Sequence, residues 1–180
     1  MKFSKRISFQ LLLAASAVFA FNPNLHATEG DTIPPCRGYG YDLPVNNSQV
    51  LHWKRTTENQ FRERAHVQGP ILQLFSIGDR DHVHFEIQLG KYSDETLEVI
   101  YNQDFGKLPP IHPGMQVEAC GDYITSTAPS GPYPASPVGA IIHWIHMNPN
   151  NSKHDAGFLV IDGKLYGQDI EHVPPRRSDR

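Results

Sequence analysis

The sequence lacks most of the signatures by which enzymes and membrane proteins are recognised. It has only two cysteines in 180 residues and no CxxC pair, so a thiolate zinc site is not indicated. No serine lies in a GxSxG elbow and no glycine-rich loop follows a strand, which argues against a serine hydrolase and a phosphate-binding loop. No apolar run approaches the ~20 residues that a membrane-spanning helix needs.

Basic residues do not outnumber acidic ones in this sequence. The chain has 16 Lys and Arg against 19 Asp and Glu, which gives a formal net charge of −3. A protein that holds nucleic acid by neutralising phosphates needs the opposite balance. A nucleic-acid partner is therefore not expected, although a small local basic patch is compatible with these numbers.

The N-terminus does contain the pattern of a secretory signal peptide. A short apolar run lies within residues 7–21, which suits an h-region and is too short for a membrane span. Small residues permit cleavage after Ala20 or after Ala27, and we favour Ala27 because Ala20 lies very close to the apolar run. No cysteine lies near either position, so a lipid anchor is not indicated. The basic residues that precede the run are Lys2, Lys5 and Arg6.

We therefore expect residues 1–27 to be removed and the protein to be exported, either to a periplasm or out of the cell, without a transmembrane anchor. An uncleaved N-terminal anchor is the alternative interpretation. The remaining chain of 153 residues is long enough for one domain with its own core. Its formal net charge is about −6, because the removed segment has three basic residues and no acidic one.

Export bears on the two cysteines, Cys36 and Cys120. In an oxidising compartment an isolated pair is most simply a disulfide. It would close a loop of roughly 85 residues, stabilise the fold by ~4 kcal/mol in the loop-entropy model, and tie the N-terminal arm to a core strand. Free or metal-binding thiols are the competing interpretation, which the spacing does not favour.

Residues 64–170 carry the patterns of several short strands. The clearest is 82–89, where Val83, Phe85 and Ile87 point to one face while His82, His84 and the other polar residues point to the opposite face. Further strands are expected over 65–75, 96–102, 116–124, 140–146, 157–161 and 164–166. Such spacing predicts a mainly β fold, a small five- to seven-stranded barrel that is closed or partly open.

The segments that flank the predicted barrel differ from it in composition. Residues 28–63 form an arm, irregular over 28–46 where Gly, Pro and Tyr are frequent. Asn47 and Ser48 are good N-cap residues, so a short helix is expected to follow them. Residues 171–180 are expected to be a disordered tail.

Histidine is the residue type most able to carry chemistry here, with ten in the chain. Neutral imidazoles bind transition metals such as zinc, and the candidate ligands are His143, His146, His154 and His84. On a regular strand His143 and His146 point to opposite faces, so both serve one metal only where a bulge or the strand's end intervenes. Solvated or structural histidines are the alternative interpretation.

Several local features, taken in order, resemble the small bacterial family named domain of unknown function 3465. The most distinctive is His143-Trp144-x-His146-x-Asn148-Pro149, with His154 and Gly157 downstream. The weaker features are Val67-x-Gly69, His82 or His84 before Phe85, Leu97-Glu98-Val99 through Asn102, Gly114-x-x-Val117, Gly121-Asp122-Tyr123 and Leu165-Tyr166-Gly167. The resemblance implies an oligonucleotide/oligosaccharide-binding (OB) barrel and supplies no catalytic residues.

This chain departs from the family pattern at two positions. It has Tyr101-Asn102 where the family has His-Asn, and Asn148 where the family has Asp. These three residues and Trp144 are the candidate ligand-contacting side chains, since an aromatic ring offers a stacking platform.

Two functions from different classes remain open. The first is an exported binding module of the cell envelope or secretome, with a glycan, a peptide or an envelope protein as its ligand. The second is a metal-dependent hydrolase, phosphodiesterase-like or nuclease-like, that uses the histidine cluster. A metal-buffering or structural role is a third possibility, and single-stranded nucleic-acid binding, suggested by the fold class alone, is a fourth.

Overall fold

The computed structural model describes residues 32–76, 81–149 and 154–171. The expected signal peptide and residues 172–180 of the expected tail lie outside the described residues. Within the described ranges no helix is long and apolar enough to cross a membrane.

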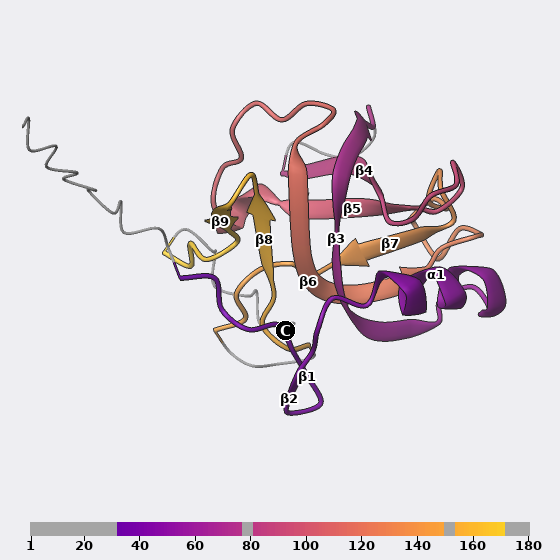
Figure 1. Ribbon diagram of the computed structural model, residues 1–180, viewed down its shortest axis with the longest axis horizontal. Coiled ribbons are helices and arrows are strands. Elements are labelled where there is room, and N and C mark those ends of the chain that lie inside the picture. The colour runs from indigo at the N-terminus through magenta and orange to yellow at the C-terminus, as the bar shows by residue number, and fades with distance from the viewer. Residues whose placement is uncertain (1–31, 77–80, 150–153, 172–180) are drawn as a thin grey trace, which may run out of the picture.

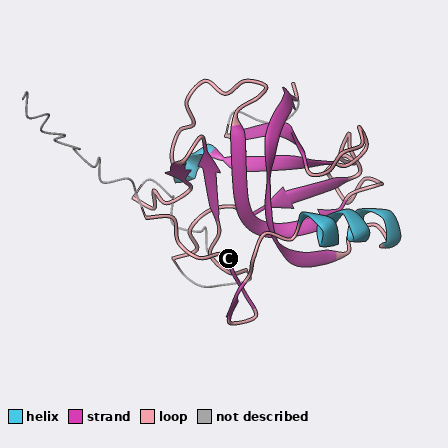
Figure 2. Ribbon diagram, in the orientation of Figure 1, coloured by secondary structure: helices cyan, strands magenta, loops and turns pink. Residues whose placement is uncertain are grey.

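The described chain consists of one α-helix, one 3-10 helix and nine strands (Figure 2). The helices are α1 (Asn47–Thr56) and η1 (Gln103–Phe105). The strands are β1 (Arg37–Gly38), β2 (Tyr41–Asp42), β3 (Arg62–Leu74), β4 (His82–Gln88), β5 (Thr96–Asn102), β6 (Gln116–Thr125), β7 (Ala140–His143), β8 (Phe158–Ile161) and β9 (Lys164–Tyr166).

Five of these strands close into a barrel in the order β3-β4-β5-β7-β6, and β6 then pairs with β3 (Figure 1). The β5–β7 pair is parallel and the other pairs of the ring are antiparallel. Strands β8 and β9 extend the sheet from β6. The predicted mainly β, small OB-like barrel is thereby confirmed.

Alternation along the strands produces the core. On β4 the side chains of Phe85 and Ile87 point into the barrel, and on β5 those of Leu97, Val99 and Tyr101 do so; all five are completely buried. Burying a large apolar side chain contributes roughly 1.5–3 kcal/mol, so the inward face of these two strands is a major source of stability.

The N-terminal arm is attached to the barrel through a disulfide and the helix. Cys36 and Cys120 form the predicted disulfide, with a Cα–Cα distance of 5.5 Å. The described part of the arm is more regular than expected, because β1 and β2 form a hairpin that projects from the barrel (Figure 1). Helix α1 was predicted, and its N-cap is Asn46, whose side chain accepts a hydrogen bond from the His66 amide instead of capping the helix.

Strand β7 is shorter than predicted. It ends at His143 because Trp144 adopts a left-handed conformation with φ of 53°, which breaks the extended backbone. The residues after Trp144 therefore no longer follow the alternation of a strand. This local break decides how the histidines around it are arranged.

Candidate functional site

The four histidines proposed from the sequence lie in one chain of ring contacts. The ring of His154 is 5.4 Å from that of His146 and 5.5 Å from that of Trp144, centroid to centroid. Trp144 stacks on His143 at 5.0 Å, and His143 is 6.0 Å from His82. The ring of His82 is in turn 6.5 Å from that of His84. We call these five histidines and Trp144 the histidine cluster.

The break at Trp144 leaves the imidazoles of His143 and His146 close enough to interact electrostatically. Behind it, the amide of Gly157 donates to His146 O at 2.7 Å and the amide of Met147 donates to Gly167 O at 2.6 Å. A Cβ on Gly157 would lie 2.5 Å from Trp144 O, so only glycine permits this close approach. The segment that carries His154 is thereby held against the end of β7.

The imidazoles of His84, His146 and His154 each have one ring nitrogen engaged by an oxygen. The Nδ1 atoms of His146 and His154 donate to the carbonyls of Met147 and Asp155, at 2.8 and 2.9 Å. The Nδ1 atom of His84 lies 2.7 Å from a carboxylate oxygen of the buried Glu98. Because carbonyls only accept hydrogen bonds, His146 and His154 carry their proton on Nδ1 and present Nε2 with its lone pair when neutral.

Burial keeps the middle of the cluster uncharged. Desolvation, with smaller contributions from the neighbouring histidines, lowers the pKa of His143 to about 3. Desolvation likewise lowers the pKa of His146 to about 4, against a hydrogen bond to Met147 that raises it. Phe105 stacks on the His146 ring at 3.6 Å and supplies much of its apolar surroundings. At neutral pH both rings are therefore neutral and able to accept a hydrogen bond or bind a metal.

A metal site with three protein ligands is not formed among the residues that the structure describes. No three His, Cys, Asp or Glu side chains there lie close enough together to hold one ion. The cluster instead consists of adjacent pairs of imidazoles.

The side chains proposed to contact a ligand are mostly engaged within the protein. Trp144 is packed by His143 and His154, and the Arg62 guanidinium lies 5.4 Å from its ring centroid. Asn148 donates to the His154 carbonyl. Asn102 accepts a hydrogen bond from the amide of Asp104 at the start of η1, at 2.8 Å.

Tyr101 does not reach the surface at all. Its side chain points into the barrel, is completely buried, and donates to the Gly106 carbonyl at 2.7 Å. Burial raises the pKa of its hydroxyl. The proposal that Tyr101 contacts a ligand is therefore corrected, since the alternation on β5 turns this residue inward, and we assign it a role in packing.

The outer surface of β4, β5 and β7 is a second candidate site, from which the residue patterns singled out only His84, His143 and Asn102. We call it the β4–β5–β7 face, defined by the outward residues His82, His84, Glu86, Gln88, Thr96, Glu98, Ile100, Asn102, Ile141 and His143. Glu86 and Glu98 face each other across β4 and β5, and they are only 6% and 2% exposed. Gln73 donates to Glu86 at 2.6 Å.

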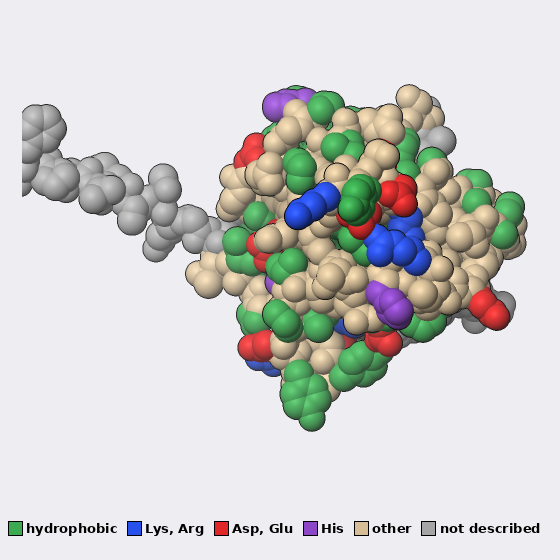
Figure 3. Space-filling view, turned by 45° about the vertical axis from the view of Figure 1, so that its right-hand side comes forward, with side chains coloured by type: hydrophobic (Ala, Val, Ile, Leu, Met, Phe, Trp, Pro, Cys, Tyr) green, Lys and Arg blue, Asp and Glu red, His purple; other side chains and the backbone are tan. Residues whose placement is uncertain are grey.

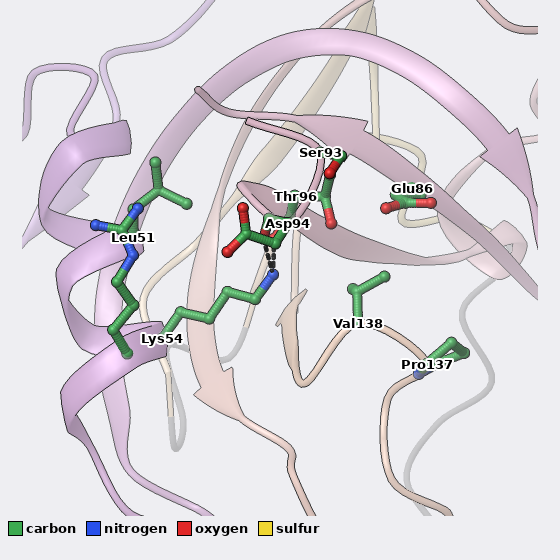
Figure 4. Close-up of a pocket in the computed structure, with 9 residues that line it drawn as sticks. Leu51, Lys54, Glu86, Ser93, Asp94, Thr96, Pro137 and Val138 are labelled. Carbon is green, nitrogen blue, oxygen red and sulfur yellow. Dashed lines mark hydrogen bonds between the residues drawn. The ribbon is translucent and has the colours of Figure 1, made fainter. Parts of the chain in front are cut away.

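A hollow of about 450 Å³ lies over one end of this face (Figure 4). Lys54 reaches in from α1 and donates to the carbonyls of Asp94 and Thr96, while Pro137 and Val138 lie on the opposite side. Burial lowers the pKa of Lys54, against the nearby acidic groups. The lining also includes Leu51, Arg55, Glu86 and Ser93. The hollow therefore offers cationic, anionic, hydroxyl and apolar groups within one space.

A smaller hollow of about 390 Å³ opens beside His154 on the arm side. Its wall is stabilised by Arg64, a buried guanidinium that pairs with Asp122 at 2.9 Å and donates to the carbonyl of Arg37 at 2.8 Å. Arg64 also donates to the carbonyl of Ala156, next to the segment that carries His154. Of the histidine cluster, His154 lines this hollow.

Charges of both signs are mixed on the surface. On the side seen in Figure 3, Lys and Arg side chains lie next to Asp and Glu side chains and form no extended patch of one sign. Ion pairs such as Arg55–Glu95 and Arg37–Asp42 contribute to this mixing. This side of the molecule therefore lacks the continuous positive stripe along which a nucleic-acid backbone binds.

Compared with models of known protein families, with characterised proteins and with solved structures, the chain gives no match. The resemblance to the domain of unknown function 3465 family stays a prediction. The function is therefore argued from the two sites themselves.

Proposed function

We propose that this protein is an exported glycan-binding module of the cell envelope or secretome, and that its ligand lies on the β4–β5–β7 face. The observation that carries the proposal is the hollow of about 450 Å³ over β4 and β5. Its volume lies within the range of small-ligand sites, and its mixed lining suits a ligand with many hydrogen-bonding groups.

The position of the hollow supports the same proposal. OB barrels bind oligonucleotides and oligosaccharides on the face of their second and third strands, beside the loop between the fourth and fifth. In this barrel those strands are β4 and β5, and that loop, between β6 and β7, contains Pro137 and Val138. This argument is an analogy between folds, so the chemistry of the site must choose the ligand.

The charge of the face favours an oligosaccharide over an oligonucleotide as the ligand. Glu86 and Glu98 lie side by side on the face, and the whole chain is acidic, so a polyanionic oligonucleotide meets repulsion there. The hydroxyl groups of a sugar can donate hydrogen bonds to a carboxylate such as Glu86 and accept them from Lys54 or Arg55. A neutral or amine-bearing glycan is therefore the ligand that the face fits best.

The proposal is tested by probing the protein without its signal peptide on an array of bacterial envelope and host glycans, with a peptide library beside it. We expect binding to a subset of glycans. Glu86→Gln, which removes the charge but retains the shape, should weaken that binding at least tenfold. Glu118→Gln is the matched control, because Glu118 lies on β6 and pairs with His66 away from the hollow.

Selective binding to peptides, or equal binding by both variants, would overturn the assignment. Export is tested separately by fractionating cells and measuring the mass of the processed chain, which should begin after Ala27 or Ala20. A full-length chain that stays with the membrane would contradict export.

A metal-dependent hydrolase is the second candidate function, and the histidine cluster favours it. Neutral imidazoles with one nitrogen fixed by an oxygen are the form in which histidine binds a catalytic metal, which would lower the pKa of a bound water. A panel of phosphodiester and ester substrates, assayed with and without zinc, tests this candidate. Hydrolysis that depends on zinc and is lost in His154→Ala supports it, and no turnover in the zinc-loaded protein rejects it.

A further inference from the structure

We propose that His146 and His154 form a two-histidine binding site for a divalent transition-metal ion of the zinc class, with water completing the coordination. This inference goes beyond glycan binding, because neither residue lines the hollow over β4 and β5. It holds whether or not the bound ion is hydrolytic.

The distance between the two rings fits a shared ion. Two imidazoles that bind one Zn²⁺ at ~2.0–2.1 Å have centroids roughly 4.5–5.5 Å apart when the N–Zn–N angle is about 90–120°. The rings of His146 and His154 are 5.4 Å apart and nearly perpendicular, at 89°.

The other histidine pairs of the cluster do not fit. The rings of His82 and His84 are 6.5 Å apart, which would require an essentially linear N–Zn–N arrangement on one zinc ion at ~2.1 Å. The rings of His82 and His143 are 6.0 Å apart, which would require a strongly opened angle. Within the described residues the ring distances therefore single out His146 and His154, in agreement with the absence there of a group of three ligands.

Both rings have their Nδ1 atom engaged by a backbone carbonyl. Each Nδ1 donates to the carbonyl of the residue that follows it, so each Nε2 is the nitrogen left for an ion. The His146 ring is fixed by the stack on Phe105, and the His154 ring by the stack on Trp144. Little side-chain freedom would be lost when an ion binds, which favours binding.

An ion can also reach the pair. His146 is almost covered, but His154 lines the hollow of about 390 Å³ beside it. The hollow is lined by three acidic residues, Glu63, Asp122 and Asp155, and by two basic ones, Arg62 and Arg64, so its acidic groups exceed its basic groups by one.

The test is calorimetric titration of zinc into the chelator-treated mature protein, made without an affinity tag and with its disulfide intact. We expect one equivalent to bind, and His154→Ala to weaken binding at least tenfold. His112→Ala is the matched control, since exposed His112 makes the same Nδ1 contact with the following carbonyl, at 3.1 Å, without a second histidine ring in contact among the described residues. It should bind zinc as the wild type does.

His146 is buried against Phe105, so replacing it could unfold the protein. Its role is therefore tested without a substitution, by zinc-edge X-ray absorption of the zinc-loaded wild type. The spectrum should show two imidazole ligands and oxygen ligands. No binding, undiminished binding by His154→Ala, an equal loss in His112→Ala, or a shell without two imidazoles would each overturn the site. Glycan binding by His154→Ala should be unchanged, so this proposal and the proposed function fail separately.

Discussion

Replacing Arg64 with methionine should destabilise the protein far more than any change to an exposed arginine. Arg64 is 6% exposed, and its guanidinium joins three parts of the chain: the arm through Arg37 O, strand β6 through Asp122, and the segment before Gly157 through Ala156 O. Methionine fills a similar volume but makes none of these hydrogen bonds.

The expected loss of stability in Arg64→Met follows from the burial of the Arg64–Asp122 ion pair. Removing one partner of a buried ion pair costs about 3–5 kcal/mol, because the other charge is left uncompensated. The Asp122 side chain is 21% exposed, so water compensates part of that loss and the lower end, about 3 kcal/mol, applies. The control is Arg37→Met, which breaks an ion pair with Asp42 whose side chains are 65% and 70% exposed. Such a pair contributes less than about 1 kcal/mol.

The assay is urea unfolding followed by circular dichroism and tryptophan fluorescence, with the disulfide verified by mass in every sample. Arg64→Lys retains the charge without the planar fork and should fall between the wild type and Arg64→Met. If Arg64→Met lost no more stability than Arg37→Met, the view that this guanidinium holds the arm and the histidine segment to the barrel would be refuted.

Three further predictions concern stability. Removing the disulfide by replacing Cys36 and Cys120 with serine should lower the free energy of unfolding in urea by about 2–5 kcal/mol. A decrease below about 1 kcal/mol would show that linking two residues 84 positions apart contributes little to stability. The pKa of His143 is about 3 in the folded protein against about 6.5 in an unfolded chain, so its contribution is complete above pH 6.5 and is lost as the pH falls toward 3, at about 1.4 kcal/mol per pH unit. His143→Gln should flatten this slope in chelator-treated protein, and identical slopes would contradict the assignment. Gly157→Ala places a Cβ 2.3 Å from Cys120 O and should lower the unfolding free energy by about 2 kcal/mol, whereas a neutral effect would mean that the segment relaxes freely.

Local alternation was sufficient to predict most of the barrel. Phe85 and Ile87 alternate with polar residues on β4, and the inward side of that alternation is completely buried. The tight turn between β8 and β9 is also predictable, because Asp-Gly is a dipeptide typical of such turns, and Asp162 and Gly163 both adopt positive φ. These features depend on neighbouring residues only, which is why the sequence indicates them.

The covering of the β4–β5–β7 face could not be predicted in this way. Alternation places Glu86 and Glu98 on the outer side of their strands, where a carboxylate is normally solvated. Glu86 shares the lining of the hollow with Lys54 on α1 and Val138 in the loop before β7, and Glu98 lies against the imidazole of His84. Contacts between segments so distant in the sequence leave no periodic signal.

The histidine cluster was predicted in part. The residue types identified His143 and His146, and strand alternation raised the objection that they point apart. The left-handed backbone of Trp144 ends the strand alternation, so His143 and His146 need not point apart. A left-handed conformation is uncommon for tryptophan, so the sequence does not predict it. Phe105, which fixes the His146 ring, belongs to η1, and nothing in the sequence pattern connects it to the cluster.

The most direct test of the proposed function is a map of where a glycan contacts the protein. Backbone amide shifts of the isotopically labelled protein without residues 1–27 would be recorded during titration with the glycan that binds best on the array. The proposal predicts that the shifts concentrate on β4 and β5, on residues 93–96 and on residues 137–138, and that Glu86→Gln reduces them. Shifts confined to the β1–β2 hairpin or to the His146–His154 pair, or no shifts with any glycan, would contradict it.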